Sequence, residues 1–474
     1  MIKRDLGRTM SAQATTQVAA AHSVSTARPP AAGRLMPEGF LPGTLMLPAI
    51  AVWIASSSSR SFGLPQIAGI PQLTLQRIVL SLVVLYALAS IALRRPRLGP
   101  IGWSEASLWV VVSYAGFAGF SFGSFEADPG SKEYLTSSLF FPAIVYSLLL
   151  RTRLTEMDVV RFAVILTLFG LYLGITAILE RSPFTWAVFP SAIVDPGQGI
   201  HFGRSRGPFL QAAINGTVIV QLLPVALLLV GLSFQQHRIL GAACAVLLCV
   251  GAYLTHTRAS LLSLGVVLIS GAVLPSLGRR RYVALLLPLA LCGAVWAGSG
   301  HAVIPRMDES QPIRDRLSLL IATGEMIAAH PMQGVGFGDF EQVQRQYYVS
   351  GAAFGAVAFA KELWEGGSHN TLLTPLAEMG LLIGGLYLVL LFRIPLISFR
   401  SRVPVARGSV RHPVAVCGGL VGLAFLVNAV FVELRFSLTA NALLWTFAAL
   451  AERCRNAEPS ALVPPHRAGS SSAR

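Results

Sequence analysis

Long apolar runs, separated by short polar and basic segments, dominate the hydrophobic pattern of this chain. A helix needs about 20 apolar residues to cross the roughly 30 Å of hydrocarbon in a bilayer. By that criterion the pattern predicts twelve transmembrane helices and an all-α, polytopic membrane protein. The predicted spans are 40–57, 74–93, 105–123, 134–150, 159–179, 211–232, 238–255, 259–276, 282–299, 371–392, 413–432 and 437–452.

Two polar tails and one long polar loop remain outside these spans. Residues 1–38 are rich in Ala, Ser, Thr and Pro and lack the apolar core of a signal peptide, so they are predicted to form a disordered cytoplasmic tail. Residues 453–474 form a second such tail. The segment 39–299 carries spans one to nine, 300–370 forms a long, helical outer loop, and 371–452 carries spans ten to twelve.

Composition and charge support this class and fix an orientation. Only 12% of the residues are charged and the mean hydropathy is +0.63, whereas about a quarter of a typical soluble domain is charged. The net charge of +15 could indicate nucleic-acid binding. Most of the lysines and arginines, however, fall in alternate loops and in both tails, which the positive-inside rule explains better. Both termini are therefore predicted to be cytoplasmic and the 300–370 loop to be periplasmic.

Several arginines lie on the predicted outer side, where orientation does not explain them. They occur in the segment Arg204-Ser205-Arg206-Gly207-Pro208-Phe209, in the turn Thr255-His256-Thr257-Arg258-Ala259-Ser260, and as Arg314 and Arg316 in the long loop. One such arginine could simply extend its charge to lipid headgroups. Several on one side favour a polyanion site, because guanidinium groups match phosphate oxygens.

His369 precedes the tenth predicted span and is the first candidate for chemistry. Imidazole has an ordinary pKa of about 6.5, which suits a general base near neutral pH. The alternative is that His369 only anchors the helix at the membrane surface. Ser368 or Asn370 could cap that helix, whose N-terminal end would favour a bound phosphate.

Other polar groups are candidates for supporting roles. Glu378 would lie about 13 Å further along a continuous helix, either as the buried partner of an arginine or with a catalytic role. His256 could support Arg258. Gly336 lies in a glycine run typical of a phosphate-binding loop, but no GK[ST] follows, so a re-entrant turn is favoured. The acids lack metal-ligand spacing, which predicts a metal-independent protein.

The motifs together resemble the O-antigen ligase and polymerase superfamily. They are RGPF before one span, THTRAS between two spans, MIAAHP and GVGFGDF in the long loop, and SHNTLL leading into LAEMGLLIGG. The resemblance covers roughly residues 200–390 and includes the twelve-span layout. It implies that His369 is the catalytic histidine and that Arg206, Arg258 and Arg316 bind pyrophosphate.

The resemblance also implies a reaction. The protein would be an inverting glycosyltransferase of the bacterial inner membrane that moves a glycan from undecaprenyl pyrophosphate to an acceptor glycan or glycolipid, without a cofactor and without nucleic acid. A lipid A–core acceptor would make it a ligase and a second lipid-linked repeat would make it a polymerase; the motifs do not separate these. A transporter is the alternative of another class, but no internal repeat supports it.

Overall fold

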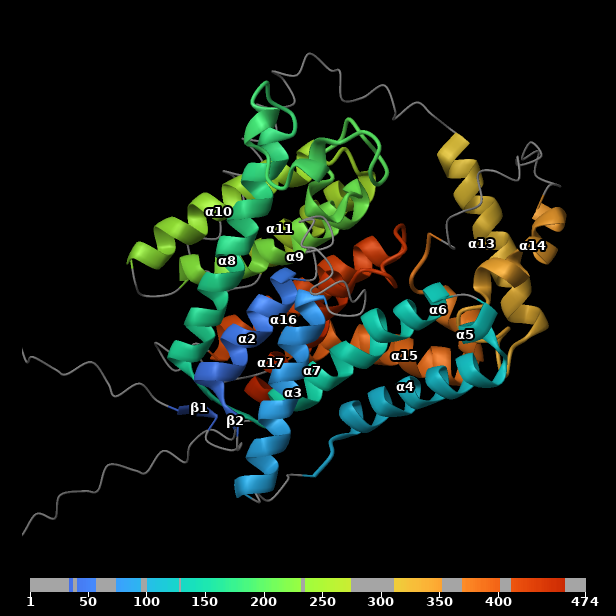
Figure 1. Ribbon diagram of the computed structural model, residues 1–474, viewed down its shortest axis with the longest axis horizontal. Helices are drawn as coiled ribbons and strands as arrows, with labels where there is room; N and C mark the ends of the chain where they lie inside the picture. The colour runs from blue at the N-terminus through green and yellow to red at the C-terminus, as the bar shows by residue number, and fades with distance from the viewer. Residues whose placement is uncertain are drawn as a thin grey trace, which may run out of the picture.

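Packed helices form the protein in the computed structural model, which describes residues 34–36, 41–56, 74–94, 100–127, 129–231, 235–273, 311–351, 369–400 and 411–456 (Figure 1). The longer helices are α2 (Gly43–Ser56), α3 (Leu75–Arg94), α4 (Trp103–Ser121), α7 (Phe141–Leu150), α8 (Glu156–Leu179), α9 (Ala212–Gly231), α10 (Gln235–Leu254), α11 (Arg258–Val273), α13 (Gln311–Ala329), α14 (Phe340–Gly351), α15 (Thr374–Arg400), α16 (Arg411–Ala429) and α17 (Leu438–Asn456).

The predicted all-α membrane class is confirmed. Eleven of the twelve predicted spans correspond to these helices, and the ninth, 282–299, lies outside the described residues. Within the described part of the chain, seven helices are both long enough and apolar enough to cross a membrane. Helices suit this environment because they satisfy every backbone hydrogen bond within one segment.

Helix α9 is the centre of the bundle. It packs against α8, α10, α11, α16 and α17, and nearly all of its side chains are buried. Its polar residues face protein: the Gln221 side chain donates to the Ala440 carbonyl of α17 at 3.1 Å. Small residues permit close packing, since a Cβ on Gly216 would lie 2.3 Å from the Ser260 hydroxyl.

A small sheet lies at the end of the bundle from which α8 begins. Strand β3 (Thr152–Thr155) pairs antiparallel with β1 (Arg34–Met36) and parallel with β2 (Leu41–Pro42). Thr155 then starts α8 with a capping box, in which its side chain accepts from the Asp158 backbone and Asp158 accepts in return. The predicted N-terminal tail thus ends in a strand, and its residues 1–33 lie outside the described residues.

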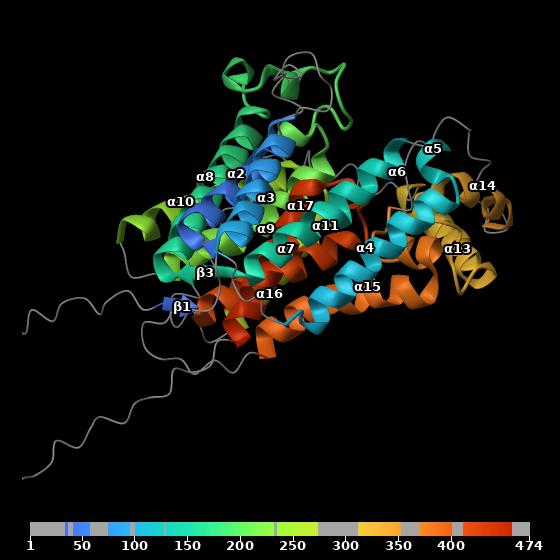
Figure 2. The ribbon, with the colours of Figure 1, turned by 60° about the horizontal axis from the view of Figure 1, so that its bottom comes forward.

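Two helices of the long loop pack together at one end of the molecule. In Figures 1 and 2, α13 and α14 lie beside the ends of α4 and α15 and the short helices α5 (Ser124–Ala127) and α6 (Pro129–Tyr134). The loop between α13 and α14 docks on α15 at a break in that helix, where Gly380 has a φ of 69°. The predicted continuous helix from residue 371 is therefore wrong: α15 begins at Thr374 and is broken six residues later.

Candidate functional site

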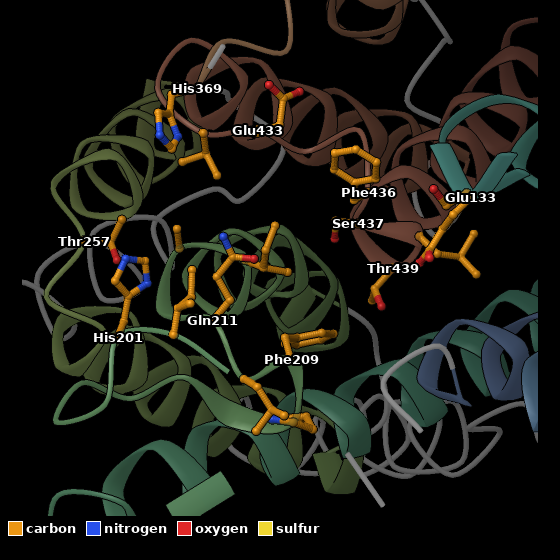
Figure 3. Close-up of a pocket in the computed structure, with 18 of the residues that line it drawn as sticks. Glu133, His201, Phe209, Gln211, Thr257, His369, Glu433, Phe436, Ser437 and Thr439 are labelled. Carbon is orange, nitrogen blue, oxygen red and sulfur yellow. The ribbon is translucent and has the colours of Figure 1, made fainter. Parts of the chain in front are cut away.

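A cavity of about 580 Å³ opens where the ends of several helices converge (Figure 3). The helices that start at its wall are α3, α9, α11, α15 and α17, whose first residues or preceding residues line it. Each N-terminus carries a partial positive charge. These partial charges favour an anion beside the N-termini, while the lining as a whole carries three arginines and three glutamates. Its charged and imidazole-bearing lining residues are Arg77, Glu133, His201, Arg204, Arg316, Glu341, His369 and Glu433.

His369 lies at the cavity wall in a turn that its neighbours fix. Its own backbone is left-handed, with a φ of 53°, and the Asn370 side chain accepts from the Leu372 and Leu373 N–H groups at 3.0 Å each. The predicted cap is thus Asn370, one turn before α15, while Ser368 lies outside the described residues.

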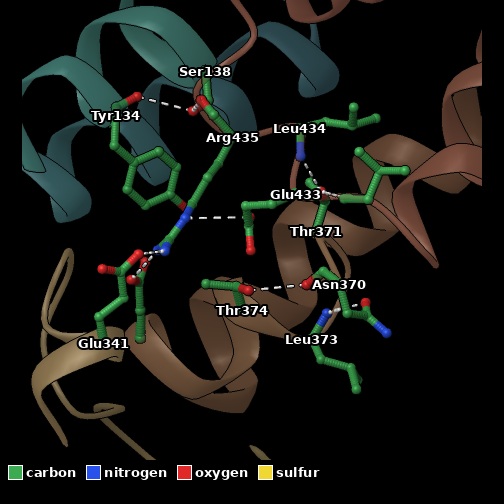
Figure 4. Close-up of polar contacts among 12 residues, drawn as sticks. Tyr134, Ser138, Glu341, Asn370, Thr371, Leu373, Thr374, Glu433, Leu434 and Arg435 are labelled. Atoms are coloured by element: carbon green, nitrogen blue, oxygen red, sulfur yellow. Dashed lines mark hydrogen bonds and ion pairs between the residues drawn. The ribbon is translucent and has the colours of Figure 1, made fainter. Parts of the chain in front are cut away.

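Thr371 fastens this turn to the loop between α16 and α17. Its N–H donates to the Ala429 carbonyl at 2.8 Å. Its hydroxyl donates to the Val432 carbonyl and accepts from the Leu434 N–H, each at 2.7 Å (Figure 4). These three bonds bring the loop that carries Glu433 to the same cavity as His369.

Three effects act on the imidazole of His369. The surrounding protein desolvates the ring and lowers its pKa, the nearby Glu433 carboxylate raises the pKa, and the Arg316 guanidinium lowers it. The net result is a pKa below the ordinary 6.5. His369 is therefore neutral at pH 7 and able to accept a proton.

Arg316 and Arg258 approach one another at this wall. Arg316 comes from α13 and lines the cavity, and Arg258 is the first residue of α11. Desolvation and the charge of Arg258 lower the pKa of Arg316. Among the residues that the structure describes, neither forms an ion pair. Two neighbouring cations without a carboxylate favour an anion between or beside them. The side chain of Arg314 is outside the described residues.

Arg204 lines the cavity; it is one of the outer arginines of the sequence but not one of the three that the resemblance assigns to pyrophosphate. Its guanidinium donates to the carbonyls of Thr255 and His256, at 2.9 and 3.1 Å, and to the Thr257 hydroxyl at 2.6 Å. It thereby ties the RSRGPF segment to the THTRAS turn. The support of Arg258 by His256 stays a prediction; the backbone carbonyl of His256 accepts from Arg204.

Arg206, in contrast, points into the protein and does not line the cavity. It is 1% exposed, and its guanidinium donates to the carbonyls of Ile193, Asp195 and Gln198. The Glu180 carboxylate accepts from the backbone N–H groups of Arg206 and Gly207. These contacts organise the loop after α8, while pyrophosphate binding by Arg206 stays a prediction without support from its position.

The glycine run surrounds a carboxylate of the protein itself. Val335 and Gly336 donate their N–H groups to the carbonyls of Ala377 and Glu378, at 2.8 and 3.2 Å, and the backbone of Gly338 and Phe340 donates to the Glu378 side chain. The loop is therefore a cradle for Glu378, which fits the predicted re-entrant turn better than a phosphate loop.

Arg435 is a buried arginine partner of Glu378, which was one of the two alternatives predicted for that carboxylate. Its guanidinium lies 2.9 Å from Glu378, 3.0 Å from Glu341 and 3.2 Å from Glu433, and its carbonyl accepts from the hydroxyls of Ser137 and Ser138 (Figure 4). Sequence reasoning missed it. Its only signal was a charge in the short segment between the last two spans.

Metal binding has no candidate within the described residues, where no group of three His, Cys, Asp or Glu side chains could hold an ion. A comparison with curated proteins gave no match. A scan against family models matched residues 243–389 to the family described as O-antigen ligase. This segment includes Arg258, Arg316 and His369, and the match is consistent with the resemblance to the O-antigen ligase superfamily that the sequence motifs indicate.

Proposed function

We propose that the protein is a glycosyltransferase that moves a glycan from undecaprenyl pyrophosphate to a hydroxyl of an acceptor sugar at the outer face of the bacterial inner membrane. The observation that carries the proposal is the cavity itself. A neutral imidazole, the guanidinium groups of Arg204 and Arg316 and five helix N-termini surround one space. The family match supports a polysaccharide-synthesising enzyme in general.

The first chemical task is to activate the acceptor. In the proposed step, the His369 imidazole takes the proton of the acceptor hydroxyl as its oxygen attacks the anomeric carbon of the donor. Such general-base catalysis contributes roughly 10²- to 10⁴-fold. Glu433 supports the imidazolium that results, because its negative charge raises the pKa of His369.

The second task is to stabilise the leaving group. The bond between the anomeric carbon and the phosphate oxygen breaks, and the diphosphate departs with the electron pair. Arg204 and Arg316, with Arg258 beside them, are fixed cations that would offset the growing charge, and preorganised groups of this kind contribute several kcal/mol. One displacement at the anomeric carbon inverts its configuration, and no step needs a metal ion.

A transfer assay tests the proposal. The purified full-length protein in nanodiscs is supplied with an undecaprenyl-pyrophosphate-linked glycan and either lipid A–core or a second lipid-linked repeat, and products are measured by mass spectrometry. We expect a new glycosidic bond, with turnover reduced at least about 100-fold in His369→Ala. The acceptor that is used decides between ligase and polymerase.

Two outcomes would refute this function. Undiminished transfer by His369→Ala would remove the proposed base. Movement of the lipid-linked glycan across a proteoliposome membrane, without bond formation, would identify a transporter instead. His330→Ala is a suitable control, because His330 lies outside the cavity and contacts the Tyr347 hydroxyl at 3.0 Å.

A further inference from the structure

The cavity has a second wall that the proposed chemistry does not use. Figure 3 shows His369, Thr257 and His201 on one side and Glu133 and Thr439 on the opposite side. The second side comes from the π-helix η3 (Leu135–Phe140), the residues just before it and the start of α17. A volume of about 580 Å³ lies within the range of sites that enclose a ligand larger than a diphosphate. The second wall therefore has room to contact another part of the substrates.

The second wall carries groups that can form hydrogen bonds with the hydroxyls of a ligand. Glu133 offers a carboxylate, which accepts two or more hydrogen bonds, and Thr136 and Thr439 offer hydroxyl groups. Phe436 lines the same space with 41% of its surface exposed. A carboxylate and hydroxyls around an exposed aromatic ring suit a sugar, whose ring has polar edges and an apolar C–H face.

Contacts within the protein hold this wall in place. The Thr136 hydroxyl donates to the carbonyls of Lys132 and Glu133, both at 3.0 Å, which leaves its oxygen able to accept. Ser437 caps α17 by accepting from the Ala440 N–H at 3.3 Å. The Phe436 ring lies beside the Arg435 guanidinium, 4.8 Å away. A preformed wall loses little entropy when a ligand binds.

We propose that Glu133, Thr136 and Thr439, with Phe436 as the apolar platform, form a subsite for an uncharged, hydroxyl-rich sugar ring. The proposal rests on the proposed glycan transfer, since it assigns the part of the cavity opposite the diphosphate. The sugar can belong to the donor glycan or to the acceptor, and both present the same chemistry to this wall. π-Helical segments such as η3 occur frequently at functional sites, which agrees with this assignment.

Direct binding tests the subsite without requiring transfer. The full-length protein in nanodiscs is titrated with neutral hexose and N-acetylhexosamine disaccharides, and binding is followed by saturation-transfer NMR. We expect at least one disaccharide to bind the wild type and to bind Glu133→Gln about tenfold more weakly, the cost of one hydrogen bond to a charged group. Thr439→Val, of equal shape, should weaken binding similarly. Glu126→Gln, an exposed carboxylate of α5 outside the cavity, is the matched control.

The outcomes distinguish this subsite from the proposed function. No disaccharide binding, or binding undiminished by both Glu133→Gln and Thr439→Val, would overturn the subsite. Inorganic pyrophosphate binding reports on the other wall: Arg204→Ala should weaken it, whereas Glu133→Gln should leave it unchanged, and equal weakening by both variants would also overturn the assignment. In the transfer assay, a rise in KM for the acceptor alone identifies an acceptor subsite, and a rise for the donor alone identifies a donor subsite.

Discussion

Two regions of this protein surround negative charge. In one region the charge is a carboxylate of the protein itself, and in the other we propose that it is the diphosphate of the substrate. In the first, Arg435 and the backbone of the 334–340 loop surround Glu378, a carboxylate that the chain supplies. In the second, Arg204, Arg316 and the helix N-termini surround an open cavity. The first region is buried and closed, since Glu378 is 0% and Arg435 3% exposed. We call it the Glu378 socket.

The difference shows what each region contributes. The socket joins three parts of the chain, because Arg435 contacts Glu341 of α14, Glu378 of α15 and Glu433 of its own loop. It therefore fixes the long loop, which carries Arg316, relative to the turn that carries His369. The cavity performs the proposed chemistry, and the socket determines its geometry. Substitutions in the socket should lower stability, whereas substitutions in the cavity should lower activity.

The largest effect is expected from Arg435→Gln. Removal of the guanidinium leaves Glu378 buried without its cation, which typically costs about 3–5 kcal/mol. The free energy of unfolding of the purified protein, measured by denaturant titration in mild detergent, should fall by that amount. The double variant Glu378→Gln/Arg435→Gln removes the uncompensated charge and should recover part of the loss. A change below about 1 kcal/mol in Arg435→Gln would show that the ion pairs contribute little net stability.

A smaller loss is expected from Gly334→Ala in the same socket. Gly334 has a φ of 72°, and a Cβ there would lie 2.3 Å from the backbone carbon of Glu378. The loop must shift, at a cost of roughly 1–3 kcal/mol. The unfolding measurement checks it, with Gly324→Ala as the control: nothing lies within 4 Å of a Cβ at Gly324, and α13 favours alanine there. Equal stability of the two variants would contradict the close packing of the loop on α15.

The two regions also differ in how far the sequence predicts them. The apolar runs predict the membrane helices, because lipid requires long apolar segments. The location of His369 and Asn370 just before a predicted span identifies them as a candidate base and a candidate helix cap. The sequence does not separate Arg204 from Arg206, since the path of the loop after α8 decides which of these alternate side chains reaches the cavity. Arg435 was missed because two of its three partners, Glu341 and Glu378, come from segments distant in sequence.

In the cavity, Arg316→Lys should lower kcat/KM for the lipid-diphosphate donor about tenfold. Lysine keeps the charge but replaces the planar donor fork that matches two phosphate oxygens. Steady-state transfer with varied donor measures the effect. The free energy of unfolding should be unchanged, because lysine keeps the charge and Arg316 forms no ion pair among the described residues. Arg161→Lys, the same substitution on an exposed position of α8, is the control. Wild-type kinetics in Arg316→Lys would argue against direct contact with the diphosphate.

The smallest effect is a shift in the pH dependence of transfer. Protonated His369 cannot accept a proton, so kcat/KM should fall as the pH decreases through the pKa of His369, which lies below the ordinary 6.5. Glu433 raises that pKa and Arg316 lowers it. Glu433→Gln should therefore move the acid limb to lower pH, and Arg316→Gln should move it to higher pH, each by less than about one pH unit. If Glu433 had only a structural role, Glu433→Gln would lower the rate without shifting the acid limb of the pH–rate profile. Shifts in the same direction for both variants would mean that His369 is not the group that titrates. That result would refute His369 as the base of the cavity, but it would leave the stabilising role of the Glu378 socket unaffected.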